Sequence, residues 1–209
     1  MTKISILGGG KVGTTLGRVF ARAGRPIGDI ASRSRASAEQ ARAVIGAGRA
    51  VDGPEDFDPL EILMVAVSDD ALPEVAERLA ASEAAGPGAV VFHCSGATAA
   101  SVLAPLRARG VRIASVHPVK SFTDPPRDAE SFAGTWCGIE GDREAVAVLS
   151  TLFEGVGARL FPIKGEQKLT YHAANVFLCN YLVPLIEAGL ACYRQAGVPA
   201  RSRCRRRSR

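Results

Sequence analysis

Three short stretches of the chain carry side chains that can exchange a proton with a substrate or orient it. In the stretch EQKLTYHAAN, Lys168 and His172 are four residues apart, as are Tyr171 and Asn175, so on a helix each pair lies on neighbouring turns. Polar side chains on an otherwise apolar helix must find partners or contact a ligand. We expect a ligand here; a hydrogen-bond network between two domains is the alternative.

The other two stretches, FHCSGAT and SVHPVKSF, each follow an apolar run that is typical of a β-strand. An imidazole exchanges protons near neutral pH, so His117 is a candidate for proton transfer or substrate binding, with a structural role in the His-Pro turn as the alternative. Ser95 can offer its hydroxyl to a substrate carboxylate or carbonyl. We interpret His93 as a structural histidine and Cys94 as a buried side chain, not a nucleophile.

A glycine cluster near the N-terminus has the spacing of a dinucleotide-binding loop. Gly8, Gly10 and Gly13 form G-x-G-x-x-G between an apolar run and a helix-like segment. In such a loop the first glycine permits a tight turn, the second lets the backbone approach a pyrophosphate, and the third allows close helix packing. A plain glycine-rich turn is the alternative. The pattern predicts cofactor contacts at Gly8, Gly10, Lys11, Val12 and Gly13.

The end of the second predicted strand indicates which dinucleotide would bind. Asp29 has about the spacing of the acidic residue that binds the ribose of NAD, but it lies inside the strand. The strand ends instead in Ser32, Arg33 and Ser34, whose guanidinium and hydroxyls can bind a 2′-phosphate. We therefore expect NADP in preference to NAD; the alternative for Ser34 is that it only caps the next helix.

The elements that must position these residues follow an alternating α/β pattern. The expected helices are 12–23, 36–45, 72–81, 100–108 and 143–156, and the expected strands are 3–7, 27–31, 62–67, 89–94, 112–116, 135–140 and 159–162. Such alternation predicts a doubly wound parallel sheet that binds ligands beyond the carboxyl ends of its strands. Val67 and Ser68 are therefore expected on the nicotinamide side of the site, with helix capping as the alternative for Ser68.

The pattern divides the chain into a Rossmann-type domain at 1–162, the start of an all-helical domain at 163–199 and an arginine-rich tail at 200–209. The tail holds six arginines; without them the net charge of +5 becomes −1, so we expect no nucleic-acid partner. Residues 173–193 are apolar enough to span a membrane, but polar residues interrupt them, and we expect a core or dimer-interface helix instead.

Cysteine usage and the N-terminus favour a cytoplasmic protein. The five cysteines have no C-x-x-C spacing, which indicates neither a disulfide framework nor a metal site. The N-terminal residues lack the charged and apolar regions of a secretory signal.

Taken together, these motifs resemble the 6-phosphogluconate and β-hydroxyacid dehydrogenase superfamily, and most closely a bacterial family with a Rossmann-like domain followed by domain of unknown function 2520. The resemblance rests on GGGKVGTTL, SRS, HCSGA, SVHPVKSF and YHAANVFLCNYLVPLIEAG, which span residues 2–199. Related proteins continue with further helices beyond QAGVP, so the resemblance implies that the helical domain is truncated here. It also implies a homodimer formed through that domain when it is complete.

The resemblance implies an NADP-dependent oxidoreductase that passes a hydride between nicotinamide and a small hydroxy or carbonyl acid. Lys168 and His117 would then handle protons, and Ser95 and His172 would orient the substrate. The His-Pro turn is also similar to that of prephenate dehydrogenases, although the glycine that normally follows that turn is missing. A protein that binds or senses NADP without turnover is a further alternative.

Overall fold

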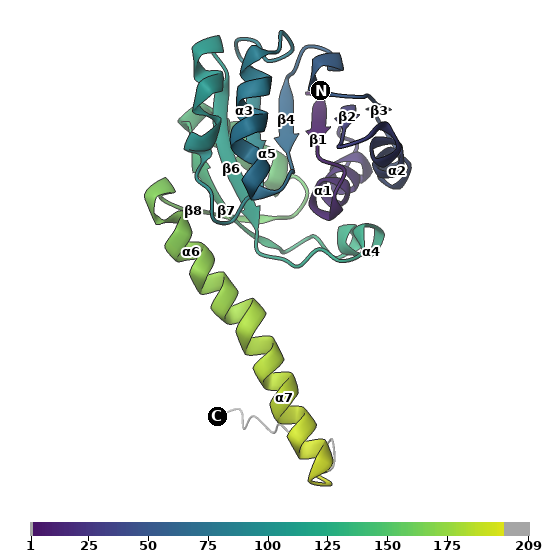
Figure 1. Ribbon diagram of the computed structural model, residues 1–209, viewed down its shortest axis with the longest axis vertical. Helices are drawn as coiled ribbons and strands as arrows, with labels where there is room; N and C mark the ends of the chain where they lie inside the picture. The colour runs from purple at the N-terminus through teal and green to yellow at the C-terminus, as the bar shows by residue number, and fades with distance from the viewer. Residues whose placement is uncertain (1, 199–209) are drawn as a thin grey trace. The chain divides into compact units, whose positions relative to one another are not determined.

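The computed structural model describes residues 2–198, so the arginine-rich tail lies outside the described residues. Its sheet has eight strands in the order β3-β2-β1-β4-β5-β6-β7-β8, and the neighbouring strands β1 and β4 run in the same direction (Figure 1). Every pair is parallel except β6 and β7. The strands are β1 (Ile4–Leu7), β2 (Ile27–Ala31), β3 (Arg49–Ala50), β4 (Ile62–Val65), β5 (Val90–His93), β6 (Arg112–Pro118), β7 (Trp136–Gly141) and β8 (Arg159–Pro162).

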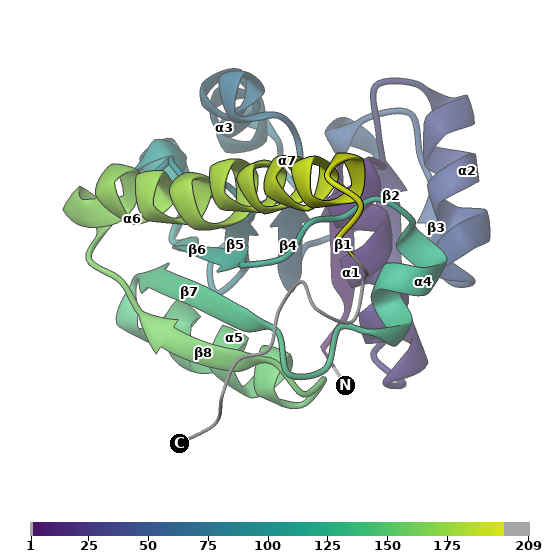
Figure 2. The same ribbon diagram turned by 90° about the horizontal axis from the view of Figure 1, so that it is seen from below.

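Helices cover both faces of this sheet. The α-helices are α1 (Lys11–Arg22), α2 (Arg35–Ile45), α3 (Leu72–Ala81), α4 (Pro125–Glu130), α5 (Arg143–Glu154), α6 (Lys168–Asn175) and α7 (Leu182–Gln195). Side chains of α1, α2 and α5 form one apolar core with the sheet, and α3 and the 3₁₀ segment Ala100–Arg109 form another on the opposite face (Figure 2). This confirms the predicted doubly wound α/β fold, because near-continuous apolar strands require cover on both faces.

The structure departs from the expected elements in several places. Strand β7 runs antiparallel to β6, whereas the alternating pattern predicts parallel strands throughout. Residues 100–109 form a 3₁₀ helix and not an α-helix, and Pro105 within it has no amide hydrogen to donate. Strand β3 and helix α4 are additional elements. The Asp124 side chain caps α4 and two prolines begin it, a start signal that is readable in the sequence.

The remaining 3₁₀ segments are Pro54–Asp56, Asp69–Ala71 and Gly165–Gln167, and Val176–Tyr181 forms a π-helical segment between α6 and α7. The described chain divides into two compact units, the first ending at Lys168 and the second beginning at Leu169. Lys168 therefore belongs to the first unit, although it is also the first residue of α6.

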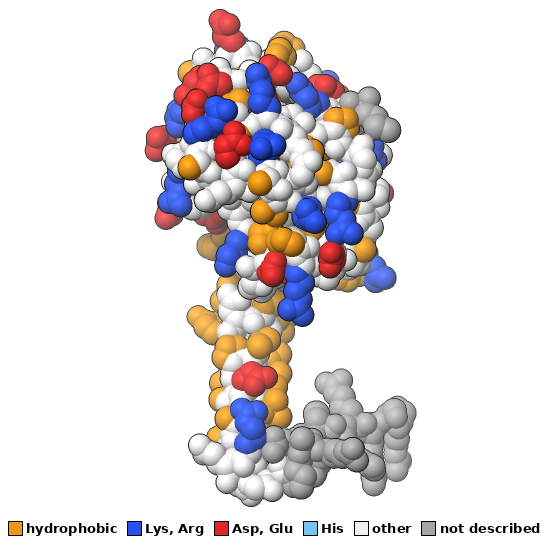
Figure 3. Space-filling view, turned by 90° about the vertical axis from the view of Figure 1, so that its right-hand side faces the viewer, with side chains coloured by type: hydrophobic (Ala, Val, Ile, Leu, Met, Phe, Trp, Pro, Cys, Tyr) orange, Lys and Arg blue, Asp and Glu red, His pale blue; other side chains and the backbone are white. Residues whose placement is uncertain are grey.

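The second unit is a helical run with a largely apolar surface. Gly165–Gln195 is the one helix among the described residues that is long and apolar enough to cross a membrane, and its most apolar window, with a mean hydropathy of 1.5, is not buried. Hydrophobic side chains, orange in Figure 3, line the visible side of this helix. The large exposed ones are Leu169, Phe177, Leu178, Tyr181, Leu182, Val183, Leu185, Ile186 and Tyr193.

Candidate functional site

The glycine loop connects β1 to α1, at the carboxyl edge of the sheet. Gly8 has a φ of +118°, and a Cβ atom there would lie 2.4 Å from the Ala66 carbonyl oxygen. A Cβ at Gly13 would lie 2.0 Å from the Gly8 carbonyl oxygen, whereas a Cβ at Gly10 would meet nothing within 4 Å. The packing of the chain thus requires Gly8 and Gly13 to be glycine, but it does not require this of Gly10.

A phosphate-binding loop requires open space next to its second glycine, because the phosphate must approach the backbone there. Gly10 has such space. Gly10 is the N-cap of α1 and carries no capping side chain, so the first amides of the helix can bind an anion. Lys11 is exposed and Val12 half-buried at the start of that helix. The Gly9 amide donates a hydrogen bond to Ser32 Oγ at 3.3 Å, which ties the loop to the end of β2.

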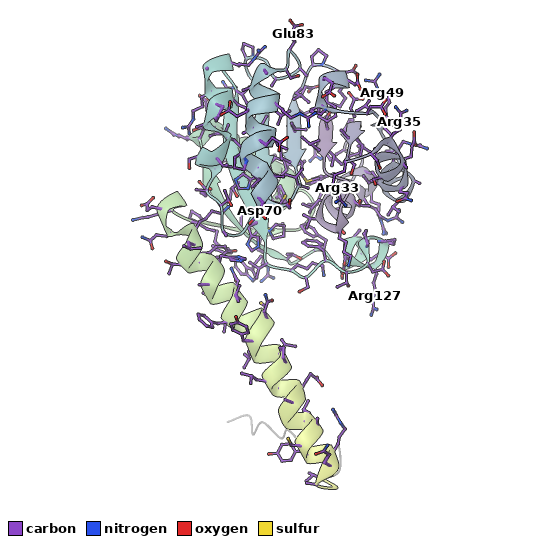
Figure 4. All side chains as sticks on the ribbon, in the orientation of Figure 1. Arg33, Arg35, Arg49, Asp70, Glu83 and Arg127 are labelled. Carbon is purple, nitrogen blue, oxygen red and sulfur yellow. The ribbon has the colours of Figure 1, made fainter. Side chains whose placement is uncertain are left out.

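Arg33 lies directly beyond β2 and is exposed. Figure 4 shows Arg33 and Asp70 towards the same end of the first unit. Within residues 2–198 the Arg33 guanidinium makes no ion pair, whereas Arg35 pairs with Asp52 at 3.3 Å and with Glu39 at 3.5 Å. Ser34 Oγ accepts a hydrogen bond from the Ser37 amide, so the helix cap expected as its alternative role is present.

Asp29 has a structural role inside the sheet. Its side chain is buried, and it accepts hydrogen bonds from Arg49 Nε and from the Asp58 amide, both at 2.7 Å. Burial alone would raise the pKa of Asp29, but these two hydrogen bonds and the Arg49 charge outweigh it and lower the pKa. Both carboxylate oxygens therefore already have partners in the protein.

The Lys168 side chain is buried within the first unit and is only 1% exposed. Its Nζ donates a hydrogen bond to the Ser95 carbonyl oxygen at 2.7 Å and a second one to Ser115 Oγ. The Glu140 carboxylate lies 3.8 Å from the same nitrogen. Burial lowers the pKa of Lys168 to about 8, while Glu140, the nearest opposite charge, acts to raise it.

Ser95 and His93 lie next to Lys168 at the carboxyl end of β5. Ser95 Oγ donates a hydrogen bond to Asp69 at 2.7 Å and accepts hydrogen bonds from the amides of Ala97 and Thr98. His93 Nδ1 accepts a hydrogen bond from the Ser95 amide, so Nε2 carries the ring proton and donates it to the Ala99 carbonyl oxygen.

The structure agrees with the interpretation of His93 as a structural histidine, because both of its ring nitrogens have protein partners. Burial, together with the Lys168 charge, lowers the pKa of His93 to about 4. Burial likewise raises the pKa of the Cys94 thiol to about 12, a value that disfavours a thiolate nucleophile at neutral pH.

His117 lies on the strand that carries Ser115, whereas His172 lies on a helix of the second unit. His117 is half-buried on β6 two residues after Ser115, so the two side chains point to the same face of the sheet. His172 is half-buried and lies one turn after Lys168 on α6, in the second unit. Asn175 Nδ2 donates a hydrogen bond to the Tyr171 carbonyl oxygen, which gives the amide a local partner on the helix.

Val67 and Ser68 follow β4 at the carboxyl edge, and Ser68 takes the N-cap position of the 3₁₀ turn Asp69–Ala71 without a side-chain cap hydrogen bond. Glu140 is the member of the site that sequence reasoning missed. A carboxylate at the end of the apolar stretch TWCGIE is the signal that could have identified it. Among the described residues, no group of three or more His, Cys, Asp and Glu could hold a metal ion.

The sheet order, the glycine loop and the polar carboxyl edge together define a protein of the Rossmann type. Comparison with known proteins refines this: the chain belongs to the Rossmann-like domain family, whose model matches residues 1–118, and residues 135–206 match the model of domain of unknown function 2520. The family expected from the sequence motifs is therefore confirmed. No curated protein matches the chain.

Solved structures with similar folds include proteins named as oxidoreductases. Protein TM1727 of Thermotoga maritima is 28% identical over 95% of this chain and 72% of its own, with a TM-score of 0.70. A Bacteroides fragilis protein is 20% identical over 95% of this chain and 74% of its own (TM-score 0.76). It is named provisionally as an NADP oxidoreductase.

A pyrroline-5-carboxylate reductase of Coxiella burnetii is 15% identical over 97% of this chain and 74% of its own (TM-score 0.69). At these identities the Bacteroides and Coxiella likenesses show the fold.

Proposed function

We propose that the protein is an NADP-dependent oxidoreductase acting on a small hydroxy or carbonyl acid. The proposal depends on one arrangement: a glycine loop with open space above Gly10 lies on the same sheet edge as a buried lysine whose pKa is about 8. The first feature suits a dinucleotide pyrophosphate and the second suits proton transfer near neutral pH.

The residues of the glycine loop fit the group that the fold implies. The amides at the start of α1 would hold the pyrophosphate, and Arg33 with Ser32 and Ser34 would hold a 2′-phosphate. A bound nicotinamide donates or accepts a hydride. Because the Arg33 guanidinium makes no ion pair within the described residues, it can bind a phosphate without first breaking one.

Lys168 and His117 would handle the proton that accompanies the hydride. In the reducing direction, the Lys168 ammonium would release a proton to the substrate oxygen as that oxygen becomes a hydroxyl, leaving a neutral amine. Since the pKa of Lys168 is about 8, both forms of the amine are populated close to neutral pH. Ser95 would orient the substrate by exchanging its hydrogen bond to Asp69 for one to the substrate.

The 2′-phosphate assignment is tested by titrating the intact protein with NADPH and NADH by calorimetry. Arg33→Ala is expected to weaken NADPH binding by about tenfold or more, because the loss of charged hydrogen bonds costs about 1.5–3 kcal/mol, and to leave NADH binding unchanged. Arg42→Ala is the matched control, since Arg42 is an exposed arginine on α2 that pairs with Glu39 instead. Equal NADPH affinity in wild type and Arg33→Ala would contradict the assignment.

The burial of Lys168 also favours a second candidate function, a protein that binds NADP without turnover. The Lys168 side chain is 1% exposed and its ammonium already contacts Ser95, Ser115 and Glu140, so it could serve only to link neighbouring strands. Oxidation of NADPH can be followed with a panel of small keto acids as substrates. Turnover that disappears in Lys168→Met while NADPH affinity is retained supports the enzyme. Retention of turnover in that variant would exclude Lys168 from the proposed chemistry.

A further inference from the structure

The Glu140 carboxylate is largely shielded from water. Glu140 lies near the end of β7, paired in register with Ser115 on β6, and its side chain is 9% exposed. One oxygen, Oε1, accepts a hydrogen bond from the Ala100 amide at 2.6 Å and lies 3.8 Å from Lys168 Nζ. A buried carboxylate needs such partners, because an unpaired one would be costly.

The two hydrogen-bond acceptors of Lys168 are neutral groups, unlike the Glu140 carboxylate. The Ser95 carbonyl and the Ser115 hydroxyl orient the ammonium, but neither carries a charge that would keep it protonated. The titratable groups that act on it from the neighbouring elements are Asp69 beyond β4, His93 on β5, Cys94 after β5 and Glu140 on β7.

Of these four groups, Glu140 provides the dominant opposite charge. Asp69 is exposed and accepts the Ser95 hydroxyl hydrogen bond, so water and Ser95 reduce its effect on the lysine. His93 is neutral because its pKa is about 4, and Cys94 is a thiol because its pKa is about 12. Glu140 alone forms an ion pair with Lys168 among the described residues.

We propose that Glu140 is the positioning residue of this site and that its carboxylate, paired with Lys168, favours the protonated form of that lysine. The ion pair holds the ammonium against Ser95 and Ser115, and it offsets part of the desolvation cost that burial imposes on the lysine. The catalytic use of this effect rests on the proposed function, but the effect itself does not. Glu140 also lines a surface groove of about 720 Å³ together with Ala99, Gly165 and Glu166.

The experiment measures the pKa of Lys168 directly by NMR of lysine-labelled protein. The chain has five lysines, so few signals are expected, and the Lys168 signal is identified by its loss in Lys168→Met. Glu140→Gln keeps an oxygen that can accept the Ala100 hydrogen bond and removes the charge. We expect the pKa of Lys168 to fall by about one unit or more in this variant, a change of about tenfold in proton affinity.

Two further variants separate charge from packing. Glu140→Asp keeps the charge but withdraws it by one methylene group, so the pKa of Lys168 should lie between those of wild type and Glu140→Gln. Glu166→Gln, on the same groove, should leave it unchanged, because Glu166 makes no ion pair with the lysine within residues 2–198.

The inference is overturned if the pKa of Lys168 is the same in wild type and Glu140→Gln, or if Glu140→Asp lowers it as far as Glu140→Gln does. An NADPH titration of the same samples tells this failure from that of the proposed function. Strands β4, β5 and β6 lie between β7, which carries Glu140, and β1, which leads into the glycine loop, so we expect wild-type NADPH affinity in Glu140→Gln. Absence of NADPH binding in wild type would contradict the proposed function and leave the effect of Glu140 on Lys168 standing.

Discussion

Replacing Gly10 by alanine should separate the stability of the protein from its ability to bind a dinucleotide. The Gly10 backbone has a φ of −74° and a ψ of −177°, a conformation that alanine adopts without strain. The new Cβ would meet no protein atom within 4 Å. Because Gly10 is an N-cap, alanine should cost about 0.5–1 kcal/mol of helix stability, which corresponds to a fall in Tm of about 1–4 °C in a chain of this size.

The same methyl group would occupy the space through which the backbone approaches a pyrophosphate. We therefore expect NADPH affinity to fall by about 100-fold in Gly10→Ala, equivalent to about 2.8 kcal/mol. The assay pairs thermal unfolding without ligand with a calorimetric titration of NADPH. A matched comparison is Gly13→Ala, whose Cβ would lie 2.0 Å from the Gly8 carbonyl oxygen and should disrupt the fold itself.

The result that would refute this reasoning is an unchanged NADPH affinity in folded Gly10→Ala. It would mean that the pyrophosphate does not contact this loop, whatever the motif indicates. A large loss of thermal stability in Gly10→Ala would contradict the premise that no protein contact requires glycine there.

Two further predictions concern buried ionisable groups. His93 stays neutral in the folded protein down to about pH 4, whereas the unfolded chain takes up its proton near pH 6.5. The unfolding free energy should therefore decrease by up to about 3 kcal/mol as the pH falls from 6.5 to 4, and urea titrations should show a weaker decrease in His93→Asn. Asp29→Asn should destabilise the protein by about 1–3 kcal/mol at pH 7, because it leaves Arg49 without its buried partner, yet it should not change NADH affinity. A marked loss of NADH affinity in that variant would indicate that Asp29 binds the cofactor ribose after all.

Much of the fold is predictable because its signals are local. The glycine loop, the strand ending at Ala31 and the helix Leu72–Ala81 all follow from residue spacing, and the structure places them as expected. The polar turns after β5 and β6 lie at the same carboxyl edge, because these two strands are parallel neighbours in the sheet.

The direction of β7 could not be predicted, because the sequence of this strand does not indicate whether it runs parallel or antiparallel to β6. Glu140 was missed for the same reason: its partners come from Ser115 across the reversed pair and from Lys168, 28 residues further along the chain. The spacing with His172 makes Lys168 a candidate, but its burial and its contact with Ser115 are tertiary properties that no spacing predicts.

The reversal at β7 falls at the boundary between the two segments that the family models match. The Rossmann-like match ends at residue 118, the last residue of β6, and the second match begins at 135, one residue before β7. Strands β7 and β8 therefore lie in the segment that the second model matches, yet they complete the sheet begun in the first segment. A fragment cut at this junction would expose β6 as a bare edge prone to self-association. Lys168 and Glu140 would be lost with the downstream half, so recombination at this point would have to exchange both halves of the ion pair together.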